Sequence, residues 1–130
     1  MDSQIKGNEG EQFVNQLAFS TFFKYWCYPS PKLENGNKKE ICDLLIIFKD
    51  IVIIFSVKNY EFKGNHNRYF NSTISKATKQ INGAYKTLFS RGEVYIKHPD
   101  KEFQEIFPKH SLKKVFRIIV NLGENTKFYP

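Results

Sequence analysis

The sequence predicts a mixed α/β (α+β) domain in which helices flank a central mixed sheet, with the element order αβββαβ. Two neighbouring runs of β-branched and aromatic residues, Ile41–Phe48 and Ile51–Val57, have the length and composition of buried strands. Amphipathic helical patterns lie before and after them, and a last strand pattern covers Val115–Leu122. At 130 residues we expect one domain, residues 1–130.

The first helix is expected to begin at Asn8, with Glu11 as the reciprocal capping acceptor, and to end near Trp26. Tyr28–Leu33 contains two prolines and is therefore expected at a sheet edge. The second helix is expected from Thr73 to Phe89, with an apolar stripe of Ile74, Ala77, Ile81, Tyr85 and Leu88. The remaining segments are predicted as a polar loop at Lys63–Asn71, a short strand at Glu93–Lys97 and a helical turn at Glu102–Phe107.

Three polar side chains interrupt the two central strands. If Lys49-Asp50 is the turn of a hairpin, Asp43 lies opposite Ser56, and Lys58 lies two residues further on the same face. Directly opposed Cβ atoms are about 4.5–5.5 Å apart. The pattern therefore predicts that a carboxylate, a hydroxyl and an ammonium group meet at one place, whereas a three-residue loop would separate them.

The composition is basic, with a net charge of +7, which indicates an acidic partner: nucleic acid or an anionic membrane. No apolar run is long enough to cross a bilayer and the N-terminus does not resemble a signal peptide, so we expect a cytoplasmic protein without a membrane partner. Cys27 and Cys42 are expected to be buried free thiols. His66, His98 and His110 have no metal-site spacing and are expected at the surface.

Every charged residue between Lys63 and Arg91 is basic. Within this span we expect nucleic-acid contacts from Lys63 and Arg68 in the loop and from Lys76, Lys79 and Gln80 on the second helix. The alternative is that this is only a solvated helix face.

Four segments, residues 26–31, 40–45, 53–58 and 76–80, together with the element order, resemble the PD-(D/E)xK nuclease superfamily, the fold of many restriction endonucleases and Holliday-junction resolvases. They are most similar to a group of uncharacterised bacterial nuclease-like proteins with Tyr-Pro-x-Pro, Cys-Asp-Leu-Leu and Phe-Ser-x-Lys motifs. The resemblance covers nearly the whole chain and implies a restriction-endonuclease-like fold.

The resemblance also implies a Mg²⁺-dependent (or Mn²⁺-dependent) DNA endonuclease, with a role in restriction or phage defence. Asp43 would be the main metal ligand, with the Val57 carbonyl and Glu11 as further ligands, and Lys58 would be the catalytic lysine. Gln80 matches a polar residue that lines the site in some branches. Many such enzymes act as dimers, so the resemblance leaves a homodimer open.

Ser56 departs from the superfamily pattern, because the catalytic position two residues before the lysine is normally Glu or Asp. A hydroxyl is a weak ligand for Mg²⁺. Glu11 first, and then Glu34, are the expected replacements, because Glu40 falls on the opposite strand face from Asp43 unless a loop or bulge precedes the strand.

Several alternatives stay open on the sequence alone. Asp43 and Lys58 could form a structural ion pair, Glu11 could be only a capping residue, and Ser56 could be a core hydroxyl. The function is then either that of a DNA endonuclease or that of a catalytically weak or inactive nuclease fold that binds nucleic acid or a protein partner.

Overall fold

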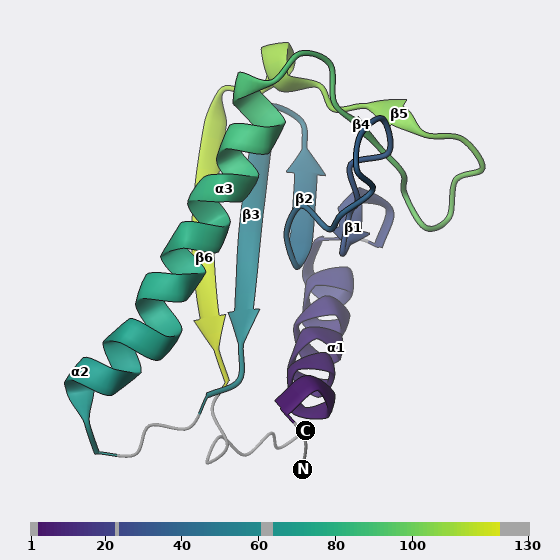
Figure 1. Ribbon diagram of the computed structural model, residues 1–130. Coiled ribbons are helices and arrows are strands. Elements are labelled where there is room, and N and C mark those ends of the chain that lie inside the picture. Colours follow the sequence, from purple (N-terminus) through teal and green to yellow (C-terminus); the bar gives the residue numbers. More distant parts are fainter. Residues whose placement is uncertain (1–2, 23, 61–63, 123–130) are drawn as a thin grey trace.

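The computed structural model describes residues 3–22, 24–60 and 64–122, which form a mixed α+β fold around a four-stranded sheet (Figure 1). The strand order is β1-β2-β3-β6, and the long helices α1 (Ser3–Phe22) and α3 (Lys76–Ser90) pack on its two faces. The predicted mixed α+β class, with a mixed sheet and a helix on each face, is confirmed. Within the described residues, no helix is both long enough and apolar enough to span a membrane.

The sheet is built on the predicted hairpin of β2 (Leu44–Phe48) and β3 (Ile51–Lys58). Phe48 pairs with Ile51 and Leu44 with Phe55, which confirms the predicted register. The edge strand β1 (Cys27–Pro29) is antiparallel to β2, whereas β6 (Lys114–Asn121) runs parallel to β3. Parallel pairing requires a long crossover connection between β3 and β6, and this connection carries α3.

Each face of the sheet has its own apolar core. Alternate β-strand residues point to opposite faces, so Leu45, Val52 and Ile54 pack with the α3 side, including Ala84 and Leu88. The α1 core is formed by Val14, Ala18, Cys27, Leu44, Ile46, Val57 and Leu122. By this alternation Ser56 and Lys58 belong to the α3 face of β3.

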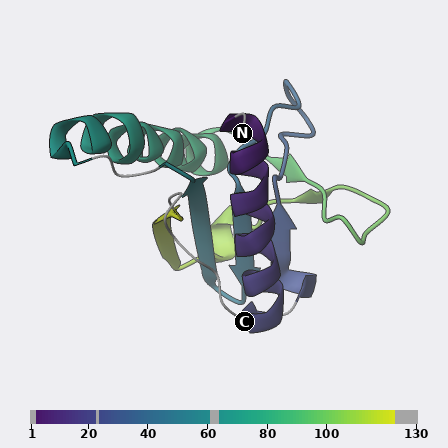
Figure 2. The same cartoon turned by 90° about the horizontal axis from the view of Figure 1, so that it is seen from below.

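The connection before α3 is helical from His66 onward, so the predicted polar loop is wrong over residues 66–71, whereas Gly64 and Asn65 precede the helix. The short helix α2 (His66–Tyr69) is capped by the Asn65 side chain, which accepts a hydrogen bond from the Arg68 backbone N–H at 3.0 Å. A turn of π-helix, Phe70–Ser75, joins it to α3. Seen from below, the helical segment formed by α2, the π-helical turn and α3 projects away from the sheet (Figure 2).

The first helix begins earlier than predicted. It starts at Ser3, so Asn8 lies inside it and is not its cap. The helix ends at Phe22 and is followed by a 3-10 turn at Lys24–Trp26. Because the helix starts five residues earlier than expected, Glu11 lies beyond its first turn, and its carboxylate is not needed to cap that turn.

A small hairpin, β4 (Tyr95–Ile96) and β5 (Glu105–Ile106), replaces the predicted helical turn at Glu102–Phe107. The Phe107 N–H donates to the Val94 carbonyl at 2.7 Å, so the segment gains a long-range partner in place of local helical bonds. A second 3-10 turn follows at Lys109–Ser111.

His98 is buried, which contradicts its predicted surface position, while His66 and His110 are exposed as predicted. The His98 Nδ1 accepts from the Asp100 N–H at 3.1 Å, which leaves Nε2 to donate to the Lys24 carbonyl at 3.1 Å. Both ring nitrogens therefore have partners. Cys27 and Cys42 are free thiols as predicted, with Cys27 buried and Cys42 half-buried.

Candidate functional site

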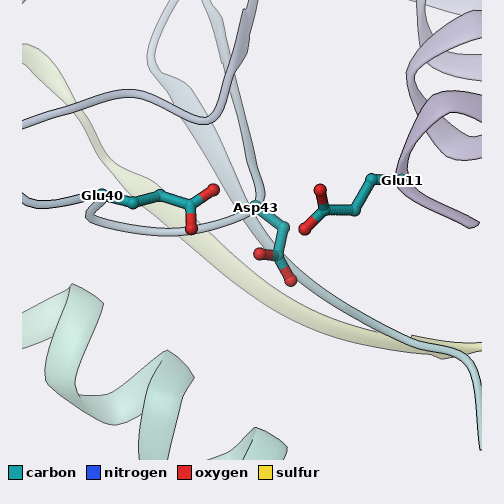
Figure 3. Close-up of side chains that lie close together, drawn as sticks. All are labelled: Glu11, Glu40 and Asp43. Atoms are coloured by element: carbon teal, nitrogen blue, oxygen red, sulfur yellow. The ribbon is translucent and has the colours of Figure 1, made fainter. Parts of the chain in front are cut away.

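Three carboxylates meet at the end of the sheet where β2 begins and β3 ends. One carboxylate oxygen from each of Glu11, Glu40 and Asp43 lies within 4.8 Å of the others. Figure 3 shows the side chains of Glu11 and Glu40 pointing toward Asp43 from opposite sides. A donor set made only of carboxylate oxygens suits a hard divalent cation such as Mg²⁺ or Mn²⁺.

Asp43 is held at the centre of this cluster by backbone groups. β2 begins only at Leu44, yet the Asp43 N–H still donates to the Phe55 carbonyl of β3, at 3.3 Å. The Asp43 backbone carbonyl accepts a hydrogen bond from the Ser30 N–H at 2.9 Å. The Asp43 side-chain Oδ2 accepts one from the Val57 N–H at 2.7 Å. The Asp43 carboxylate is thus held against Val57, near the end of β3. Asp43 is the residue expected from the sequence to be the main metal ligand.

Glu40 joins the cluster, which contradicts the prediction that it faces away from Asp43. The prediction assumed a strand from Ile41 onward. Instead, the Ile41 N–H donates to the Pro31 carbonyl at 2.7 Å, and the backbones of Glu40 and Lys32 form an isolated antiparallel β-bridge. This segment pairs with the chain that follows β1, so simple alternation along β2 does not apply to it.

Glu34, the second predicted replacement for the missing acid, is not part of the cluster. Its N–H donates to the Tyr95 carbonyl at 2.9 Å, which ties residue 34 to the β4 strand. Glu11, the first predicted replacement, is in the cluster.

Glu11 reaches Asp43 because α1 approaches the sheet closely at Gly10. A Cβ atom at residue 10 would lie 3.0 Å from the Leu122 Cδ1 and 3.6 Å from the Asn59 Cβ. The absence of a side chain at Gly10 thus permits the approach that brings the next residue, Glu11, to the sheet end.

We expect Gly10→Leu to destabilise the fold by about 1–3 kcal/mol, because the new side chain overpacks the contact with Leu122. Gly7→Leu is the matched control, since a Cβ there meets nothing within 4 Å. It should stabilise the helix by up to about 1 kcal/mol through helix propensity. Urea denaturation measures both changes, and equal effects at the two positions would contradict the close approach at Gly10.

Burial and the negative charge of Asp43 raise the pKa of both glutamates in the cluster. Glu11 has a pKa of about 7, mainly because burial removes water from the carboxyl group, and also because it hydrogen-bonds to Asp43 and lies near the negative charges of Asp43 and Glu40. The positive charge of Lys58 acts in the opposite direction. Partial removal from solvent, together with the charge of Asp43, also raises the pKa of Glu40. A bound cation would relieve this repulsion, so the residues present fit a divalent metal.

Without metal, the free energy of unfolding should fall as the pH rises from about 4.5 to about 7. Over this range the folded protein keeps a proton on Glu11 that the unfolded chain, with its ordinary pKa of 4.5, has lost. Urea denaturation in EDTA at several pH values measures the slope. Glu11→Gln should reduce the slope, and an unchanged slope in this variant would show that another group is responsible.

Lys58 is the last residue of β3 and is half-buried, as is Asp43. Among the residues that the structure describes, no carboxylate forms a direct ion pair with Lys58, so a structural Asp43–Lys58 ion pair is not formed. Both groups retain access to solvent. The ammonium is nevertheless near enough for its charge to lower the pKa of Glu11.

Ser56 is buried, and its hydroxyl donates a hydrogen bond to the Gln80 side-chain oxygen at 3.3 Å. A small pocket is lined by residues that include Asp43, Ser56 and Gln80. Ser56 is thus a hydrogen-bonded core hydroxyl beside the cluster, and Gln80 connects α3 to this end of the sheet. Val57 supplies the N–H that holds Asp43, while the role of its carbonyl as a ligand stays a prediction.

The predicted nucleic-acid-binding residues are dispersed over the long helical run. Arg68, Lys76, Lys79 and Gln80 are exposed, and Lys63 lies outside the described residues. Gln80 also lines the small pocket beside Asp43. Lys79 instead lies on the same flank of α3 as Asn82. The Asn82 side chain accepts a hydrogen bond from Arg117 of β6 at 3.2 Å.

The signal that sequence reasoning missed is the pairing of residues 30–32 with residues 40–43, which brings Glu40 to Asp43. The clearest trace of it in the sequence is the turn-forming segment Glu34–Lys39, which reverses the chain between these residues. Comparison of the chain with protein-family models, with curated proteins and with solved structures finds no significant match.

Proposed function

We propose that the protein is a Mg²⁺-dependent phosphodiesterase of nucleic acids, a DNA endonuclease on a restriction-endonuclease-like fold. The observation that carries this proposal is the meeting of the Glu11, Glu40 and Asp43 carboxylates within 4.8 Å, next to Lys58. Carboxylate oxygens are the ligands that Mg²⁺ prefers in proteins. An ammonium beside such a cluster suits a negatively charged substrate.

In this proposal Asp43, Glu11 and Glu40 bind the cation. When bound, Mg²⁺ would supply charge neutralisation for a phosphodiester and lower the pKa of a coordinated water. The 2.7 Å hydrogen bond from the Val57 N–H keeps the Asp43 carboxylate in one orientation, which reduces the reorganisation needed on binding.

Lys58 is assigned to the substrate. Its ammonium is not used in an ion pair with a described carboxylate, so its donors are available to orient a water molecule or to stabilise the charge on the phosphate oxygens in the transition state. Preorganised charge of this kind usually contributes about 10²–10³-fold to a rate.

Glu40 is the proposed compensation for Ser56. The negative charge that Ser56 does not provide is present nearby on Glu40, which arrives from the other side of Asp43 (Figure 3). The number of acids around the cation is therefore kept, although one of them comes from a different segment. This favours an active nuclease over the alternative of an inactive fold that binds nucleic acid or protein.

Incubation of the purified protein with supercoiled, linear and single-stranded DNA tests the proposal. We expect cleavage with Mg²⁺ or Mn²⁺ and none in EDTA. Binding of these DNAs without any cleavage, at every metal concentration, would instead support the inactive fold.

DNA as the partner is supported by the net charge of +7 and by the exposed basic residues of α2 and α3. Because contacts with phosphates release counterions, the affinity should fall steeply with salt. A flat response between 50 and 200 mM salt, a range over which about 6–10 phosphate contacts cost about 10³–10⁵-fold, would count against this surface.

A further inference from the structure

A second, larger hollow lies next to the carboxylate cluster, between the loop of residues 33–41 and α3. It has a volume of about 270 Å³ and includes Glu40, Ile41 and Gln80 in its lining. Glu40 belongs to the cluster itself, and Ile41 and Gln80 also line the small pocket beside Asp43. The hollow, which we call the α3 groove, is therefore adjacent to the proposed metal site.

One stripe of α3 forms the helical wall of the α3 groove. Gln80, Gly83 and Thr87 line it at the spacing of residues on one helix face, and Arg91, the extended residue directly after α3, continues this wall. Lys76 is four residues before Gln80 and thus extends this stripe by one turn. The stripe has positive charge at both ends and uncharged residues between them.

Gly83 keeps the middle of the α3 groove open. A Cβ atom at this position would meet nothing within 4 Å, so the absent side chain leaves space rather than permitting a backbone contact. Glycine in a helix interior costs about 1 kcal/mol relative to alanine. The fold does not need this residue for packing, and the open space is available to a ligand.

The α3 groove offers different chemistry along its walls. Leu33, Ile41 and Ala84 supply apolar surface, while Thr87 and Gln80 supply hydrogen-bonding groups. Lys39 and Arg91 are exposed cations, and neither forms an ion pair with a carboxylate in the described part of the chain. An apolar face, polar edge groups and cations together match a base joined to a phosphate.

We propose that the α3 groove binds one unpaired nucleotide adjacent to the phosphodiester that is cleaved, so that the substrate is single-stranded or locally unpaired. Its volume is slightly below the range of about 300–1,000 Å³ of sites that enclose drug-sized ligands. It therefore fits one nucleotide and is too small for a duplex. The inference rests on the proposed function, because the nucleic-acid strand is placed in the α3 groove on account of its closeness to the carboxylate cluster.

The test measures binding, by fluorescence anisotropy, of a fluorescein-labelled 12-nucleotide oligo(dT) and of a blunt hairpin duplex of similar length, both in Ca²⁺. The wild-type protein should bind the single strand more tightly than the hairpin. Gly83→Leu fills the α3 groove and should weaken single-strand binding at least about tenfold, with little change for the hairpin. Thr78→Leu, the matched control, adds the same side chain at an exposed position of α3 that does not line the α3 groove, and it should keep the affinity.

Arg91→Met provides a second variant in case Gly83→Leu does not fold. It should weaken single-strand binding and reduce the salt slope by about one unit, whereas Lys86→Met, an exposed lysine that does not line the α3 groove, should change binding less. Equal affinity of wild type and Gly83→Leu for the single strand would overturn the inference. Equal losses of affinity for the single strand and for the hairpin in Gly83→Leu would also overturn it.

Failure of this inference can be distinguished from failure of the proposed function. If DNA is cleaved in a manner that depends on Asp43 while Gly83→Leu binds and cleaves like the wild type, the nuclease stands and the α3 groove is not its nucleotide site. If wild type neither binds nor cleaves any DNA, both are overturned.

Discussion

Asp43→Asn is expected to lower the rate of DNA cleavage by at least about 10²–10³-fold, because it removes the central negative charge of the carboxylate cluster. A metal contributes several kcal/mol of charge stabilisation, and each 1.36 kcal/mol changes a rate about tenfold. The asparagine side-chain oxygen can still accept the hydrogen bond from the Val57 N–H, so the fold should be kept. Plasmid cleavage under single-turnover conditions measures the loss.

Asp50→Asn is the matched control, because Asp50 lies in the turn at the other end of the β2–β3 hairpin. It makes the same change of charge far from the cluster and should leave the cleavage rate within about twofold, as expected for a distant site. Cleavage that survives Asp43→Asn at the rate of Asp50→Asn would show that the nuclease site lies elsewhere or that the activity comes from a contaminant.

Lys58→Met should also reduce cleavage, by about 10²–10³-fold, the usual effect of removing one preorganised donor. The change keeps the aliphatic part of the side chain and removes its charge. Loss of this positive charge removes its repulsion of a bound cation, so the affinity for Mn²⁺, measured at a pH above the pKa of Glu11, should be equal or higher. The combination of lost rate and retained affinity separates a substrate-facing lysine from a structural one.

Lys114→Met serves as the control for Lys58→Met. Lys114 is exposed and lies at the opposite end of the sheet, where it pairs with Ile51 of β3. Loss of one positive charge there should change cleavage only through the weak, salt-dependent attraction of DNA. Equal effects of the two substitutions would mean that Lys58 contributes only to the general charge of the surface.

The central hairpin could be predicted because its information is local. Two apolar runs separated by Lys49-Asp50 leave few registers, and Phe48 pairs with Ile51 as expected. Lys49 has a positive φ of 55°, which the short turn requires. The apolar stripe of the second helix could be predicted for the same reason, because its spacing is a local pattern. Ala77, Ile81 and Leu88 of this stripe are buried as predicted.

The position of Glu40 could not be predicted in the same way. Ile41 and Cys42 are apolar and look like a continuation of the strand, but the Ile41 N–H donates to the Pro31 carbonyl after β1, and β2 begins only at Leu44. His98 was missed for a similar reason, since its partners are backbone groups of Lys24 and Asp100. The Glu34–Lys39 turn and the Lys24 partner of His98 show the difficulty: a turn signal or an apolar run does not specify which distant segment becomes the partner.

The candidate site was therefore predicted in part. Asp43, Ser56 and Lys58 were placed from register alone, and the register is confirmed. The resemblance to nucleases supplied Glu11, which the structure brings to Asp43. Glu40 required the three-dimensional fold, and in the proposed function it supplies the acid that the resemblance would place at residue 56.

Binding of Mn²⁺, followed by the decrease of the electron paramagnetic resonance signal of the free ion, tests the carboxylate cluster most directly. We expect that the wild type and Asp50→Asn bind the ion, that Asp43→Asn does not, and that Glu40→Gln binds it more weakly than the wild type. Equal binding by the wild type, Asp43→Asn and Glu40→Gln, or no binding by the wild type at millimolar Mn²⁺, would contradict this expectation.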